Sequence, residues 1–123
     1  MLICGSRSWS DSLPIDVVVD GFRSGSCVVI HGGAKGADTL AARSADNQGV
    51  TAEAYPADWG THGKAAGPIR NQQMIDDAKP DVCWAFVDKP LAESRGTADM
   101  VRRARKAGIP TYVTEAWVAG GGS

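Results

Sequence analysis

The strongest constraint on the fold is a regular alternation of short apolar runs with helical stretches along the 123 residues. Apolar and β-branched runs predict five strands, at residues 1–5, 27–32, 51–56, 81–87 and 110–114. Between them, four stretches predict helices, at residues 15–22, 37–45, 68–78 and 97–106. Such alternation is typical of a parallel sheet with helices on both faces. We therefore predict an α/β fold, a Rossmann-like three-layer sandwich of about five parallel strands in the order 3-2-1-4-5.

The composition is that of an ordinary globular protein, with 43% hydrophobic and 22% charged residues. We expect one domain over residues 1–118 and a disordered tail at residues 119–123, where the sequence ends in glycines and a serine. Thirteen basic and fourteen acidic residues leave a formal net charge of −1. This balance argues against a nucleic-acid binder, which usually carries a basic excess.

The three cysteines lie in separate apolar runs without metal-ligand spacing, which favours buried thiols in a reducing compartment. No apolar run approaches the ~18 residues of a membrane span, and no charged leader precedes the first strand. We expect a cytoplasmic protein (in the host cytoplasm if phage-encoded) that does not bind membranes. The two histidines do not form a metal site, no cofactor is certain, and a magnesium requirement stays open.

Polar residues gather after four of the predicted strands, at residues 5–9, 31–38, 56–71 and 88–99. Ligands of open α/β sheets bind beyond the carboxyl ends of the strands, near the point where strand order reverses. Because the strands are predicted parallel, all four segments should meet at one edge of the sheet. This convergence predicts a ligand site there.

Glycines, hydroxyls and guanidinium groups in these segments are the groups that bind phosphate. Trp9 and Trp59 are candidates for stacking on a base. Asp38 can contact a ribose hydroxyl or simply be an acid in the first turn of a helix. The predicted ligand and phosphate-binding residues are Gly5, Ser6, Arg7, Gly32, Gly33, Lys35, Gly36, Asp38, Arg70, Asn71, Ser94, Arg95, Gly96 and Thr97.

The segment "HGGAKGAD" (residues 31–38) has two interpretations: a phosphate cradle, or a tight turn from strand to helix. It is neither a Walker A loop nor a GxGxxG motif, so a conventional NTPase or NAD enzyme is disfavoured. We interpret the basic residues at 102–106 first as a solvated helix face and second as a patch that binds phosphate or a partner.

The segments "GSRSW", "HGGAKGADTLA", "PADWGTHGKAAGPIRN" and "SRGTADM" resemble the small Rossmann-like branch of the SLOG superfamily. That superfamily is named after the DNA-uptake protein Smf/DprA and the plant LOG enzymes. The branch occurs in bacteria and phages and is described as a domain of unknown function. The resemblance covers residues 2 to about 113. It implies a Rossmann-like fold whose glycine-rich loops bind a nucleotide or nucleotide-derived ligand. Because related proteins commonly form dimers, it also implies that this protein is a homo-oligomer, a dimer.

LOG enzymes cleave the base–ribose bond of nucleoside monophosphates and carry a PGGxGTxxE loop. Here the resemblance extends only to Gly96-Thr97, and Met100 stands where that loop has its glutamate. Asp99 precedes it by one residue, which turns its side chain by ~100° around the helix.

Three hypotheses follow. The first is a sensor or carrier that binds a nucleotide-derived ligand, and the second is a phosphoribohydrolase-like enzyme with Asp38 or Asp99 as the catalytic acid. The third is a single-stranded nucleic-acid binder that uses both tryptophans and the basic face.

Overall fold

The computed structural model describes residues 1–22 and 27–115. The tail predicted at residues 119–123 lies outside the described residues. Among those described, no helix combines the length and apolarity needed to cross a membrane.

A five-stranded parallel sheet forms the middle layer, in the order β3-β2-β1-β4-β5, which confirms the predicted order. The strands are β1 (Leu2–Gly5), β2 (Val28–His31), β3 (Thr51–Ala54), β4 (Cys83–Val87) and β5 (Thr111–Glu115). The order reverses beside β1, which pairs with both β2 and β4. The carboxyl ends of β1, β2 and β4 therefore lie next to one another, as the prediction of a shared site requires.

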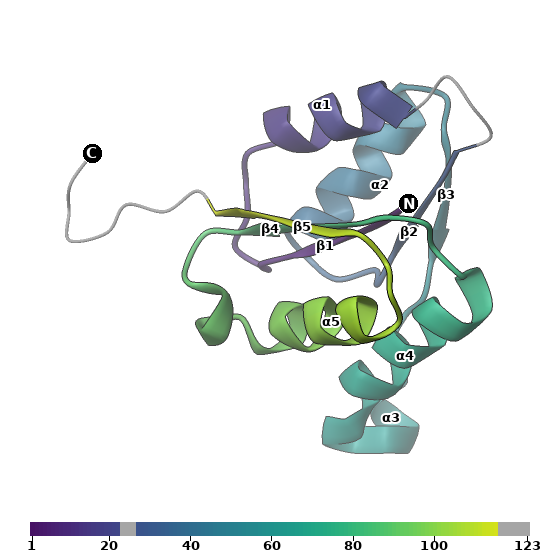
Figure 1. The fold of residues 1–123 in the computed structure, drawn as a ribbon, viewed down its shortest axis with the longest axis vertical. Helices are drawn as coiled ribbons and strands as arrows, with labels where there is room; N and C mark the ends of the chain where they lie inside the picture. Colours follow the sequence, from purple (N-terminus) through teal and green to yellow (C-terminus); the bar gives the residue numbers. More distant parts are fainter. Residues whose placement is uncertain (23–26, 116–123) are drawn as a thin grey trace.

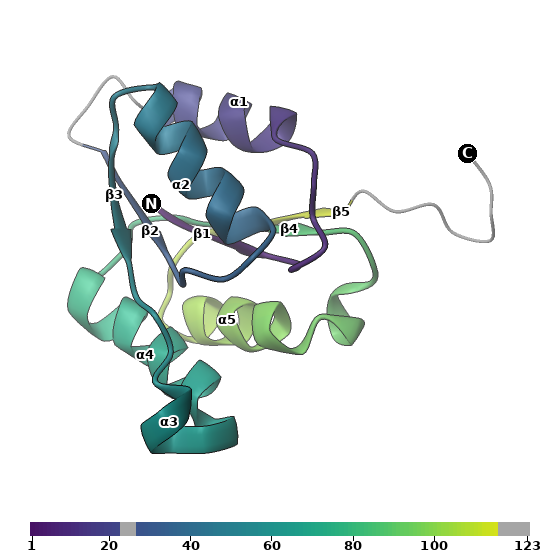
Figure 2. The same cartoon turned by 180° about the vertical axis from the view of Figure 1, so that it is seen from behind.

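Helices cover both faces of the sheet (Figures 1 and 2). Helices α1 and α2 lie on one face, and α4 and α5 lie on the other. Their bounds are α1 (Leu13–Phe22), α2 (Ala37–Asn47), α4 (Ala66–Ala78) and α5 (Arg95–Lys106). The arrangement confirms the α/β, Rossmann-like fold class.

Side chains that alternate along the central strands supply two cores. From β1, Ile3 packs in the core on the side of α1 and α2, whereas Leu2 and Cys4 pack in the core on the side of α4 and α5. Both cores are closed by apolar faces of the helices, such as Ile15 of α1 and Met100 of α5. A central strand buried on both faces explains the nearly continuous apolar runs of the sequence.

The segment at residues 56–71, predicted as a loop up to Pro68, contains more helix than expected. It forms α3 (Trp59–His62) and a 3₁₀ turn, η1 (Gly63–Ala65), before α4 begins at Ala66. Asp58 caps α3 by accepting a hydrogen bond from the Thr61 amide at 3.1 Å. Pro68 falls in the first turn of α4, where its missing N–H has no helical partner to lose. A second 3₁₀ turn, η2 (Leu91–Glu93), precedes α5, which begins two residues earlier than predicted.

Candidate functional site

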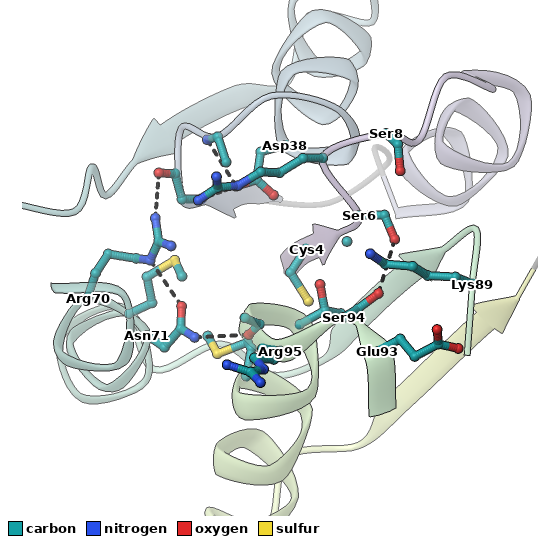
Figure 3. A pocket seen from close by; sticks show the side chains of 18 residues that line it. Cys4, Ser6, Ser8, Asp38, Arg70, Asn71, Lys89, Glu93, Ser94 and Arg95 are labelled. Carbon is teal, nitrogen blue, oxygen red and sulfur yellow. Dashed lines mark hydrogen bonds between the residues drawn. The ribbon is translucent and has the colours of Figure 1, made fainter. Parts of the chain in front are cut away.

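A cavity of about 400 Å³, called here the first chamber, opens at the carboxyl edge of the sheet. Figure 3 shows its lining side chains converging from the ends of β1, β2 and β4 and from helices α4 and α5. It lies beside β1, where the strand order reverses. This is the place where open α/β sheets bind ligands.

Eleven of the fourteen predicted ligand residues line the first chamber, because four separate segments do meet at this edge. They are Gly5, Ser6, Arg7, Gly32, Asp38, Arg70, Asn71, Ser94, Arg95, Gly96 and Thr97. Gly33 and Lys35 line a neighbouring cavity instead. Gly36 lines neither cavity.

The first turn of α5 presents hydrogen-bond donors to the first chamber. The residue before α5, Ser94, makes no side-chain cap, and the amides of residues 95–97 have no backbone partner within the described chain. Thr97 is only 6% exposed and lines the chamber, yet its hydroxyl makes no hydrogen bond to any described residue. A helix N-terminus carries partial positive charge and attracts anions. The Thr97 hydroxyl, which has no partner among the described residues, adds a further donor beside it.

Two serine hydroxyls lie next to this turn. The Ser6 Oγ is 3.4 Å from the Ser94 Oγ and accepts a hydrogen bond from the Asp88 amide at 3.3 Å. The two hydroxyls tie the end of β1 to the start of α5, although they are 88 positions apart in sequence. The Ser6 amide is committed to the Phe86 carbonyl at 2.9 Å, so Ser6 offers its hydroxyl rather than its N–H to the chamber.

The glycine loop, residues 32–36 between β2 and α2, directs most of its amides inward. The Gly32 and Ala34 amides donate to the Asp38 Oδ2 at 3.1 and 3.2 Å, and the Gly33 amide donates to the His31 Nδ1 at 3.1 Å. Three consecutive N–H groups are thus satisfied by the protein itself. The tight-turn interpretation of "HGGAKGAD" is therefore the better one. The backbone phosphate cradle predicted for Gly32 and Gly33 has no free donors at those two residues.

Gly36 has a packing role. Its φ is +77°, and a Cβ there would overlap the carbonyl oxygens of Ser6 and Arg7. The glycine therefore lets the start of α2 approach the loop after β1, where the Ala37 amide donates to the Ser6 carbonyl at 3.2 Å.

The protein environment changes the pKa of the Asp38 carboxyl. Burial raises the pKa of its carboxyl to about 6, although the amide bonds from Ala34 and Gly32 and the nearby Arg70 all act to lower it. The side chain is 6% exposed and lines the first chamber. Its Oδ2 holds the glycine loop, and its Oδ1 makes no hydrogen bond to any described residue.

Arg70 and Asn71 form a relay from the glycine loop to α5. The Arg70 Nη1 donates to the Gly32 carbonyl at 2.7 Å, and its Nε donates to the Asn71 Oδ1 at 3.0 Å. The Asn71 Nδ2 then donates to the Gly96 carbonyl at 3.2 Å and to the Asp99 Oδ2 at 3.0 Å. Both residues line the first chamber, and their hydrogen bonds also hold its walls in position.

Asp99, predicted as a possible catalytic acid, points elsewhere. It does not line either cavity, and its carboxylate is bound by Asn71, Arg102 and Arg103, the last at 2.8 Å. Burial tends to raise the pKa of Asp99, but the hydrogen bonds from Arg103 and Asn71 outweigh it and hold the pKa below its usual value. The structure therefore places the Asp99 carboxylate away from both cavities, and the same carboxylate neutralises part of the basic face at residues 102–106.

The two tryptophans that were predicted to stack on a base, Trp9 and Trp59, lie in different environments. Trp9 is 4% exposed, packs on Phe86 with ring centroids 5.6 Å apart, and donates from its Nε1 to the Asp11 carbonyl at 2.6 Å. A ring buried in the core has no face free for a base, so the stacking role predicted for Trp9 is wrong. Trp59 is 51% exposed and lines the neighbouring cavity, where a ring face is available.

Sequence reasoning missed several lining residues, of which Lys89 matters most. Figure 3 shows Lys89 reaching toward Ser6 and Ser94, which adds a positive charge beside the first turn of α5. Its position two residues after β4, in a polar segment at the carboxyl end of a strand, was the available signal. Cys4 forms part of the lining, but its contact with the Cys83 thiol, together with burial, raises the pKa of Cys4 well above its ordinary value. The thiol therefore stays protonated and is a poor nucleophile. The remaining unpredicted lining residues are Ser8, Ala34, Met74, Glu93 and Met100.

No group of three or more histidine, cysteine, aspartate or glutamate side chains within the described chain is placed to hold a metal ion.

Comparison with known proteins agrees with the resemblance to the SLOG superfamily. Residues 1–62, from β1 to α3, match the model of the YAcAr family, the YspA, cpYpsA-related SLOG family. The Gene 61 protein of Mycobacterium phage D29 is 45% identical over 118 residues, which cover 89% of this chain and 91% of the phage protein. The chain is a SLOG-superfamily protein. Within that superfamily it belongs to the YAcAr family, and it has a phage homologue.

Proposed function

We propose that the first chamber binds a nucleotide or nucleotide-derived ligand, with a phosphate group at the first turn of α5, and that the protein acts as a sensor or carrier of this ligand. The observation that carries the proposal is the Thr97 side chain. It is 6% exposed and lines the chamber, its hydroxyl has no partner among the described residues, and it lies beside amides 95–97 that have no backbone partner there. Membership of the SLOG superfamily supports a nucleotide-related ligand.

The charges of the first chamber also favour an anion. Its ionisable lining comprises four cations, Arg7, Arg70, Lys89 and Arg95, against the carboxyls of Asp38 and Glu93. One of these two carboxyls, Asp38, is partly protonated near pH 6 because its pKa is about 6. A phosphate entering the chamber therefore meets an excess of positive charge as well as helix-terminal amides.

Isothermal titration calorimetry with AMP and ADP, and with adenosine as the uncharged control, tests the proposal. We expect binding of the phosphorylated compounds and weaker or no binding of adenosine. Thr97→Val, which keeps the shape of the side chain and removes its hydroxyl, should weaken binding about tenfold or more, because hydrogen bonds to charged groups are worth about 1.5–3 kcal/mol.

Matched variants guard against indirect effects. Thr114→Val makes the same change on β5, away from the chamber, and should bind like the parent protein. Lys89→Gln should weaken binding, whereas Lys106→Gln removes the same charge at the far end of α5 and should not. Absence of binding by every phosphorylated compound, or equal affinity of the Thr97→Val variant and the parent, would contradict the proposal.

A second candidate function is cleavage of an N-glycosidic bond, and the environment of Asp38 favours it. This carboxyl lines the first chamber with a pKa of about 6, which suits a general acid or base near neutral pH. The residue at the LOG glutamate position, Met100, also lines the chamber but carries no acid. Of the two carboxyls that line the chamber, Asp38 and Glu93, the raised pKa of Asp38 makes it the stronger candidate for the acid. Release of free base from AMP, followed by chromatography, tests this, and Asp38→Asn should abolish it. Unchanged release by that variant would exclude Asp38 as the acid.

A further inference from the structure

A second chamber, with a volume of about 480 Å³, adjoins the first. Arg7, Gly32, Ala34 and Arg70 line both chambers, so the two meet at these residues along the carboxyl edge of the sheet. The second chamber extends over the ends of β2 and β3 toward α3. Each chamber alone lies within the usual volume range of small-molecule sites, roughly 300–1,000 Å³. A nucleoside monophosphate in one chamber would leave the other empty.

The second chamber joins an exposed aromatic ring to unbalanced positive charge. Its ionisable lining residues are Arg7, Lys35 and Arg70, and no carboxyl group lines it. Trp59 is held at the start of α3 by the Asp58 cap, with about half of its surface exposed. A π-face next to cations, without an opposing acid, suits a nucleobase attached to phosphate groups.

Arg7 and Arg70 lie between these features. Arg70 is held in place by its hydrogen bonds to the Gly32 and Tyr55 carbonyls, at 2.7 and 3.3 Å. Arg7 makes no side-chain hydrogen bond to any described residue and lines both chambers, so its guanidinium can bind an anion that passes from one to the other.

We propose that the ligand is a nucleoside polyphosphate or a similar pyrophosphate-linked nucleotide that spans both chambers. Its base stacks on Trp59, its inner phosphate lies at Arg7 and Lys35, and its outer phosphate occupies the first turn of α5. This inference rests on the proposed function, because it takes the phosphate site at α5 as one end of the ligand. It adds a base-binding end at Trp59 and requires a ligand long enough to reach from Trp59 to the first turn of α5.

Calorimetric titration with pyrophosphate, AMP, ADP and ATP, each in the presence of a metal chelator, tests whether the ligand spans both chambers. We expect ADP and ATP to bind about tenfold or more tightly than AMP, since only they are long enough to occupy both chambers. Trp59→Leu should weaken ADP binding about tenfold and leave pyrophosphate binding unchanged, because base stacking on an aromatic side chain is lost while the phosphate contacts remain. Tyr112→Leu changes an aromatic side chain of equal exposure on β5 and is the control.

The outcomes separate the two proposals. If AMP and ADP bind equally, and Trp59→Leu alters neither while Thr97→Val weakens both, the two-chamber ligand is wrong and the phosphate site stands. If neither pyrophosphate nor any nucleotide binds, both proposals are wrong. If Lys35→Gln and Trp59→Leu weaken ADP but not AMP, the longer ligand is supported.

Discussion

The loop after β2 and the loop after β4 both bring glycine to the start of a helix, yet their backbone amides have different partners. In the glycine loop, Asp38 and His31 accept the amides of residues 32–34. At the start of α5 the amides of residues 95–97 have no backbone partner among the described residues. The first loop is closed by its own side chains, and the second is open toward the cavity.

The difference arises from where each segment carries its acid. Asp38 lies in the first turn of α2, and its carboxylate turns back onto the loop that precedes it. The first acid of α5, Asp99, is instead bound by Asn71 and two arginines. A glycine-rich turn therefore indicates an anion site only when no nearby acceptor has taken its amides.

The largest expected effect is on folding, at the glycine that closes the first loop. Gly36→Ala should cost about 3 kcal/mol or more of unfolding free energy, because a Cβ would meet two carbonyl oxygens at a positive φ. Gly96→Ala should instead add about 0.5–1 kcal/mol, since a Cβ there meets no atom within 4 Å and alanine favours a helix. Urea unfolding followed by circular dichroism measures both. Similar stability of the two variants would remove the contrast between the loops.

The next effect is a pH dependence from the carboxyl that closes the glycine loop. The pKa of Asp38 is about 6 in the folded protein and 3.8 ordinarily, so the folded state holds the proton more tightly. The contribution of this group is therefore greatest below pH ~4 and is lost as pH rises to ~6, by about 3 kcal/mol.

Asp38→Asn removes this titration and keeps an oxygen that can accept the loop amides. The unfolding free energy of the parent protein, measured in urea from pH 4 to pH 7, should fall relative to that of this variant as pH rises. A constant difference across that range would show that the carboxyl is not perturbed.

A smaller loss of stability is expected at Asn71, whose side chain connects Arg70, beside the glycine loop, to α5. Asn71→Ala removes an amide that is 4% exposed and that bonds Arg70, the Gly96 carbonyl and Asp99. Loss of buried hydrogen bonds should cost about 2 kcal/mol of unfolding free energy and should also weaken ADP binding, because the first turn of α5 loses its support. If calorimetry finds normal ADP affinity in a destabilised variant, α5 is positioned without the relay.

The smallest effect is expected at Asp99. Asp99→Asn should cost about 1 kcal/mol, since asparagine keeps an oxygen that can accept from Arg102 and Arg103 and only the charge is lost, and it should leave ligand binding unchanged. Unfolding and calorimetry on the same variant measure both quantities. A large loss of binding would mean that the carboxylate acts on the cavity after all.

Much of the fold could be predicted because it depends on local pattern and on general rules of topology. Apolar runs such as residues 81–87 marked strands, and parallel connection of five strands with helices between them left few arrangements. The same rules brought Ser6, Gly32 and Thr97 to one edge of the sheet, and these three residues do line one cavity.

The sequence alone thus determined the sheet order, the helices around it and the edge at which the polar segments meet. The tertiary structure decided which groups at that edge are free: it buried Trp9, used Asp38 and Asp99 internally, and left Thr97 and Trp59 facing cavities. The physical reason is the scale of the interactions. Strand order follows from periodicity and chain connection over many residues, whereas the partner of one amide or the exposure of one ring depends on packing between segments far apart in the chain.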